Sequence, residues 1–98
     1  MKKKSLKNNK KLSIDFELLP LKVRTIAETM IHLKDDINFD INSSFSHHVF
    51  EVIIVNPKYF TLTPIIRETM IENGWELVIN NPLCRGLNLV FSKDKNGN

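Results

Sequence analysis

The sequence has little of several residue types, and each shortage excludes a class of protein. Its one cysteine, Cys84, excludes an internal disulfide and a zinc site built from several cysteines. Its three glycines are far apart, so there is no glycine-rich loop of the kind that binds phosphate. No apolar run reaches the roughly 18 residues that a membrane-spanning helix needs. The lysine-rich start lacks the apolar stretch of a secretory signal, so we expect a cytoplasmic protein.

What remains is the composition of one small globular domain. The chain has 98 residues, of which 42% are hydrophobic and 26% charged, which is ordinary for a folded chain. This length leaves no room for a second core. We predict a disordered lysine-rich tail over residues 1–11, a single domain over 12–92 and a polar tail over 93–98. Eleven Asn, eleven Ile, eleven Lys and one Ala also indicate an AT-rich gene, as in a low-GC bacterium, a phage or a plasmid.

The net charge of +3 comes from the tail, since residues 12–98 hold eight basic and eleven acidic residues. A basic tail on an acidic body favours a solvated segment that keeps a protein soluble, and the alternative is an arm that contacts nucleic acid. If nucleic acid binds, the candidate residues are the six tail lysines: Lys2, Lys3, Lys4, Lys7, Lys10 and Lys11.

Hydrophobic periodicity predicts seven elements in the order β-α-β-β-α-β-β. Apolar residues alternate with polar ones over 12–18 and 37–41, and large apolar residues recur at every second position over 75–80 and 87–92. Residues 48–55 are apolar on both faces except for Glu51, so we predict five strands in all. Pro20 opens an amphipathic helix, and Thr63-Pro64 begins a second one that ends before Gly74. This order predicts an α+β fold, a ferredoxin-like split β-α-β-β-α-β with an extra C-terminal strand and both helices on one face of a mainly antiparallel sheet.

An internal repeat supports this prediction. A shift of 40 residues aligns 26–31 with 66–71, with five identities in six, and also aligns Ile37 with Leu77 and Phe39 with Ile79. Two βαβ halves would leave such a repeat.

The strand phases predict which side chains face the helices. Because an unpaired charge is costly in a core, Glu51 should point outward and Phe50, Val52 and Ile54 inward. The inward set on the other strands is then Leu12, Ile14, Phe16, Leu18, Ile37, Phe39, Ile41, Trp75, Leu77 and Ile79. The outward face has an aliphatic centre with an acidic rim, and its candidate interface residues are Val49, Glu51, Ile53, Val55 and Val78.

That outward face favours a protein partner or a second copy of the chain over RNA. RNA-recognition motifs stack bases on aromatic residues of their sheet, whereas the predicted outward residues are aliphatic, polar and acidic. The alternative is that the fifth strand or the tail folds over the patch and leaves it without a function.

Several residues suggest chemistry, and each also has a structural explanation. Five carboxylates are candidates for a divalent-metal site on the sheet, although acidic residues also keep such faces soluble. His47 and His48 are adjacent, so on a regular strand they point to opposite faces and cannot ligate one metal.

Arg85 would make the thiol of Cys84 more reactive, but the sequence implies no histidine that would act with Cys84 as a catalytic base. We therefore predict no metal and no cofactor. The five carboxylates are Asp15, Glu17, Asp40, Glu51 and Glu76.

Residues 46–50, followed by 61–62 and 65–67, form a short family-like pattern. Ser-His-His-Val-Phe, Thr-Leu and Ile-Ile-Arg together resemble the Gly-Ser-His-containing hairpin and following helix of HicA-type mRNA-cleaving toxins, over about twenty residues. Phe45 stands where that family has its glycine. The resemblance implies an RNA-directed endonuclease in which His47 is the catalytic residue.

The sequence thus leads to three hypotheses. The first is a small non-enzymatic regulatory or inhibitory protein that acts through protein–protein contact, at the outward sheet face or the last strand, with tail-assisted nucleic-acid binding. The alternatives are a HicA-like endonuclease that uses His47, and a nucleic-acid-binding domain.

Overall fold

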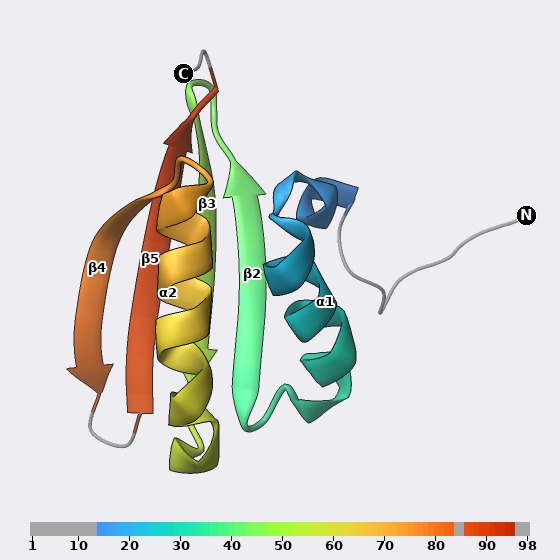
Figure 1. Ribbon diagram of the computed structural model, residues 1–98, viewed down its shortest axis with the longest axis vertical. Coiled ribbons are helices and arrows are strands. Elements are labelled where there is room, and N and C mark those ends of the chain that lie inside the picture. The colour runs from blue at the N-terminus through green and yellow to red at the C-terminus, as the bar shows by residue number, and fades with distance from the viewer. Residues whose placement is uncertain (1–13, 84–85, 96–98) are drawn as a thin grey trace, which may run out of the picture.

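The computed structural model describes residues 14–83 and 86–95, which form two helices and a four-stranded antiparallel sheet (Figure 1). The predicted α+β class is therefore confirmed. In chain order the elements are the 3₁₀ helix η1 (Ile14–Leu18), α1 (Leu21–Met30), the 3₁₀ helix η2 (Ile31–Leu33), β2 (Ile37–Ser43), β3 (His47–Ile54), the 3₁₀ helix η3 (Pro57–Leu62), α2 (Thr63–Glu72), β4 (Glu76–Leu83) and β5 (Gly86–Asp94).

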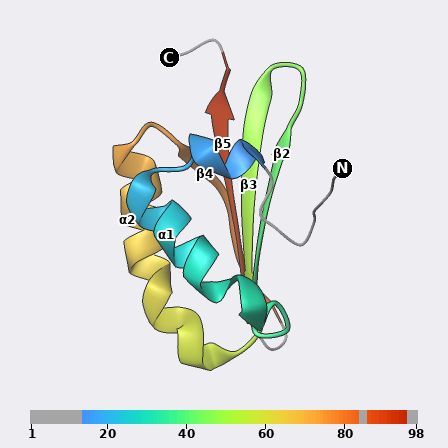
Figure 2. The same cartoon turned by 90° about the vertical axis from the view of Figure 1, so that its right-hand side faces the viewer.

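The sheet has the strand order β2-β3-β5-β4, and each neighbouring pair is antiparallel. Seen edge-on, α1 and α2 lie on the same side of the sheet, as predicted (Figure 2). β3 and β4 are both antiparallel to β5, so they run parallel to each other. They are connected through α2 with β5 inserted between them, which is a split βαβ arrangement. β5 extends to Asp94, two residues beyond the predicted end of the domain.

The first predicted strand is wrong for residues 14–18, which form η1. A 3₁₀ helix has three residues per turn, so Phe16 and Leu19 fall on one side, and both are buried. Leu18, which we expected in the core, is 44% exposed. Residues 12 and 13 lie outside the described residues.

The internal repeat has a different structural unit from the one expected. A shift of 40 residues places α1 on α2, β2 on β4 and β3 on β5, so the repeated unit is helix-strand-strand rather than βαβ. The two units meet where β3 pairs with β5, with Phe50 opposite Phe91. The sheet thus consists of two hairpins joined side by side.

The end of α2 follows the sequence prediction closely. Gly74 has a positive φ of 90°, its N–H donates to the carbonyl of Ile71 at 3.1 Å, and the N–H of Trp75 donates to that of Met70 at 3.0 Å. These two bonds define a Schellman motif. The chain therefore turns directly from α2 into β4 and places Trp75 in the core.

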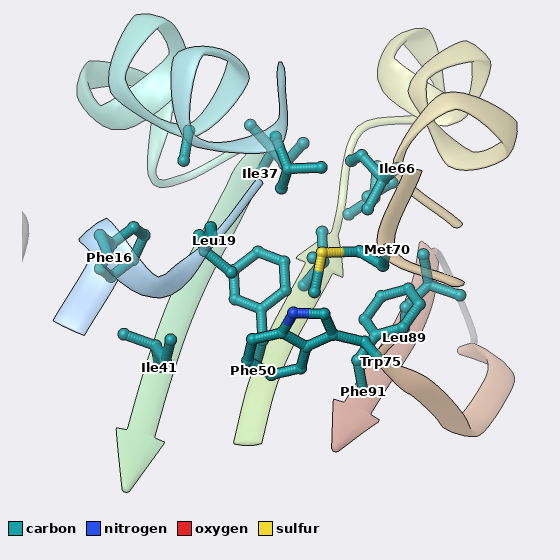
Figure 3. Packing of buried hydrophobic residues seen from close by; sticks show 14 residues of the cluster. Phe16, Leu19, Ile37, Ile41, Phe50, Ile66, Met70, Trp75, Leu89 and Phe91 are labelled. Carbon is teal, nitrogen blue, oxygen red and sulfur yellow. The ribbon is translucent and has the colours of Figure 1, made fainter. Parts of the chain in front are cut away.

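The core lies between the sheet and the helices. Phe50, Val52 and Ile54 of β3 are fully buried, as the strand phase predicts, and so are Leu89 and Phe91 of β5. Figure 3 shows Phe50, Leu89 and Phe91 close to Ile66 and Met70 of α2, and all five belong to one buried cluster. Because the inward side chains of the two central strands are covered, their other side chains occupy the opposite face of the sheet.

Candidate functional site

The face of the sheet opposite the helices has no described element over it (Figure 2). Directly opposed residues in an antiparallel pair share a face, so the strand register identifies the side chains on this side. We call these residues the open face. They are Asn38, Asp40, Asn42, His47, Val49, Glu51, Ile53, Glu76, Ile79, Asn81, Asn88, Val90, Ser92 and Asp94.

Three rows of side chains cross the open face from β2 to β4. The middle row is Asp40, Glu51, Val90 and Ile79. On one side of it runs Asn42, Val49, Ser92 and Glu76. On the other side runs Asn38, Ile53, Asn88 and Asn81. The polar residues of β2 and β4 therefore flank an aliphatic centre.

That centre consists of four half-buried aliphatic residues: Val49, Ile53, Ile79 and Val90. Val49 and Ile53 lie on this face as predicted from the position of Glu51. Val55 does not belong to the sheet, since β3 ends at Ile54 and the N–H of Val55 bonds to the carbonyl of Asp36 at 2.8 Å. Val78 is 55% exposed and lies at an irregularity of β4.

This irregularity also moves Ile79, which we expected in the core. The β4–β5 register shifts between Leu77 and Ile79, so Leu77 pairs with Phe91 on the helix side whereas Ile79 pairs with Val90 on the open face. An extra residue in one strand reverses the alternation beyond it. Sequence alternation could have identified Val90 as an outward residue, but nothing in the sequence marks the shift.

The charged side chains of the open face are acidic. Asp40 and Glu51 stand directly opposite each other on β2 and β3, and Glu76 lies at the β4 edge. Asp40 also accepts a hydrogen bond from the side chain of Asn42 at 2.7 Å. No lysine or arginine occupies an open-face position within 14–83 and 86–95. Like charges that face each other across strands repel, so this pair is unfavourable as it stands.

The fifth predicted strand does not cover this face. β5 lies within the sheet and pairs with β3 on one side and β4 on the other. Both of its edges are thus occupied, and the last strand can contact a partner only through its outward side chains. Residues 1–11 and 96–98, the two tails, lie outside the described residues.

Of the five candidate metal-binding carboxylates, the structure places Asp40 and Glu51 directly opposite each other and separates the others from this pair. Glu17 is exposed on η1, while Asp40, Glu51 and Glu76 lie on three different strands of the sheet. Asp15 also belongs to η1, and its side chain lies outside the described set. Among the described residues no group of three or more His, Cys, Asp or Glu side chains is placed to hold a metal ion.

His47 and His48 lie at the start of β3 and pair with different residues of β5. His47 is exposed, opposite Asp94, and its Nδ1 is 2.8 Å from Oγ of Ser46. His48 is half-buried, and its ring centroid lies 6.5 Å from that of Trp75. One ring is on the open face and the other on the helix side, as the alternation predicts.

Other candidate residues lie outside the described part of the chain. These are Cys84, Arg85 and the six tail lysines.

Comparison of the chain with protein-family models, curated proteins and solved structures gives no match. Its function therefore has to be inferred from its own geometry. No helix in the described part of the chain is long and apolar enough to cross a membrane.

Proposed function

We propose that this is a small non-enzymatic regulatory or inhibitory protein that binds another protein through the open face. The observation that carries the proposal is the aliphatic centre of four side chains, which the structure places on the side of the sheet away from both helices. Clustered apolar side chains within a polar rim are characteristic of protein interaction sites.

The side chains of the open face favour a protein over a nucleic acid. Single-stranded nucleic acids bind sheets through aromatic side chains that stack on bases, together with basic residues that contact phosphates. The open-face positions hold aliphatic and amide side chains, a serine, a histidine and carboxylates. Asp40, Glu51 and Glu76 would repel phosphate.

Replacement of Ile53 with aspartate should weaken the interaction strongly and leave the fold intact. Ile53 is half-buried, so a new carboxylate there remains hydrated in the free protein but would be buried in the complex. Loss of a central apolar contact costs about 2 kcal/mol or more, and about 1.4 kcal/mol corresponds to a tenfold change in affinity, so we expect at least a 30-fold weaker complex. Light scattering would measure the native mass, and co-purification from the native cells would show the partner.

The matched control is Ile65→Asp. Ile65 is 43% exposed on α2, so the same chemical change falls on the opposite side of the molecule. It should leave both the mass and the co-purified protein unchanged. A wild-type protein that is monomeric and retains no partner would contradict the proposal, and unfolding of Ile53→Asp would show that Ile53 belongs to the core.

The segregation of charge supports a second role, for the tail. Six lysines precede residue 12, whereas the rest of the chain has a net charge of −3. We propose that the tail supplies whatever affinity this chain has for nucleic acid, because the acidic open face would oppose it.

Deletion of residues 1–11 should therefore remove nucleic-acid binding and change the net charge from +3 to −3. Each lysine that contacts a phosphate adds about 0.9 to the slope of log K against log salt, so three or four contacts give a slope near −3. Affinity of the full chain for duplex DNA would then fall roughly 60-fold between 50 and 200 mM salt. Fluorescence anisotropy of a labelled duplex would measure both effects. Binding that persists after the deletion would place the contact elsewhere.

A further inference from the structure

We infer that the partner of the open face is a basic protein segment in which lysine or arginine side chains alternate with apolar ones. This inference rests on the interaction proposed above and identifies the chemistry of the partner. It is carried by the combination of carboxylates and aliphatic side chains on one face of the sheet.

The first argument is that Asp40, Glu51 and Glu76 share the open face with no lysine or arginine of the described ranges. Asp40 and Glu51 oppose each other across β2 and β3, and Glu76 lies at the opposite edge of the sheet, while the fourth open-face carboxylate, Asp94, lies at the end of β5 opposite His47. The lysines and arginines in the described ranges lie in helices or connections, apart from Lys93 of β5, which lies on the helix side of the sheet. A cation from a partner, placed between Asp40 and Glu51, would turn a repulsive pair into an attractive arrangement.

The second argument is the position of Glu51 among aliphatic residues. Val49 and Ile53 are its neighbours on the same face of β3, and Val90 is opposite it on β5. A lysine or arginine side chain has an apolar stem and a charged end. Its stem can cover these aliphatic side chains while its charge meets the carboxylate, which neither a wholly apolar nor a wholly polar residue can do.

The same features disfavour the other occupants. Two open faces placed against each other would bring together two acidic surfaces with no open-face lysine or arginine, so a second copy is a poor match. An acidic segment would be repelled for the same reason. An extended basic segment with side chains on alternate faces would present apolar and basic groups at the spacing of the strands.

The test measures how the full chain binds a labelled ten-residue peptide in which lysine alternates with valine, with a glutamate–valine peptide as the comparison. We expect the lysine peptide to bind and the glutamate peptide not to bind. Glu51→Lys should weaken binding of the lysine peptide at least tenfold. The matched control, Glu68→Lys, changes the net charge equally but lies exposed on α2, so binding should change less than twofold.

A second variant distinguishes weaker binding from a folding defect, which a lysine at the half-buried Glu51 position could cause. Asp40 is exposed on β2, so Asp40→Lys can be accommodated in the folded protein and should also weaken binding.

The affinity of the unchanged protein for the lysine peptide should fall several-fold between 50 and 300 mM salt, because added ions screen exposed charges.

Four outcomes would overturn the inference: no binding of the lysine peptide, equal loss in Glu51→Lys and Glu68→Lys, preference for the glutamate peptide, or binding only after the six tail lysines are replaced by serine. The last would identify the chain's own tail as the occupant. If the complex is sensitive to Ile53→Asp but insensitive to salt and to Glu51→Lys, the basic partner is wrong while the proposed function stands. If the complex is insensitive to Ile53→Asp, the proposed function fails.

Discussion

Replacement of Phe50 with alanine is expected to lower the free energy of unfolding by about 3–5 kcal/mol. Phe50 is fully buried on β3, where its ring is 6.2 Å from those of Phe39 and Phe91 and 6.3 Å from that of Phe16. Alanine would therefore leave a cavity bounded by η1, β2 and β5. A domain of this size has a total stability of about 5–15 kcal/mol, so the loss is a large fraction of it.

Urea denaturation followed by tryptophan fluorescence would measure the change. Trp75 is the only tryptophan of the chain and is 3% exposed in the same core, so its emission reports on this packing. Phe45→Ala is the matched control, because Phe45 is fully exposed in the β2–β3 turn and should contribute less than about 0.5 kcal/mol. Similar midpoints for the two variants would contradict the central position of Phe50.

The parts of the fold that were predictable from sequence depend on local patterns. Glu51 made it possible to predict which side chains of β3 face the helices, since a buried charge would be far more costly than a buried phenylalanine or valine. The left-handed conformation of Gly74 explains why α2 ends where it does. In both cases the physical preference belongs to the residue itself and to its immediate neighbours.

Residues 12–18 show where a local pattern is ambiguous. Their strict alternation indicates a strand, but the described part forms a 3₁₀ helix that buries Phe16 and Leu19 three residues apart. The central position that a first strand would take beside β3 is occupied by β5, whose pairing with β3 extends over eight residues. Which of two strand-like segments occupies the centre of a sheet depends on long-range pairing, and no local pattern reports it.

The open face was predictable only in part for the same reason. Val49, Glu51 and Ile53 follow from alternation along one strand. Ile79 depends on how β4 pairs with β5, and one register shift moves its side chain from the helix side to the open face. Ile79 and Val90, two of the four aliphatic residues at the centre, therefore lie on β4 and β5, and the sequence does not show where these strands lie in the sheet.

Replacement of Gly86 with alanine should produce the other large loss of stability, by a different mechanism. Gly86 opens β5 beside the end of β3, and a Cβ atom there would overlap the backbone carbonyl oxygen of Ile54. Because that oxygen belongs to the backbone, it cannot rotate away as a side chain would. The two central strands would have to separate locally, and overpacking of this kind typically costs about 1–3 kcal/mol.

The location of the damage distinguishes this effect from a general loss of stability. Hydrogen exchange should accelerate first at the end of the β3–β5 pairing where Ile54 lies opposite Leu87, and last at the other end near His47. Ser92→Ala, a small change on the open face of the same strand, should leave both the exchange pattern and the unfolding midpoint within about 0.5 kcal/mol of the unchanged protein. A Gly86→Ala protein as stable as Ser92→Ala would mean that β5 does not approach β3 this closely. The β3–β5 pairing, which joins the two helix-strand-strand units, would then have a wider separation between the backbones of Gly86 and Ile54 than the structure shows.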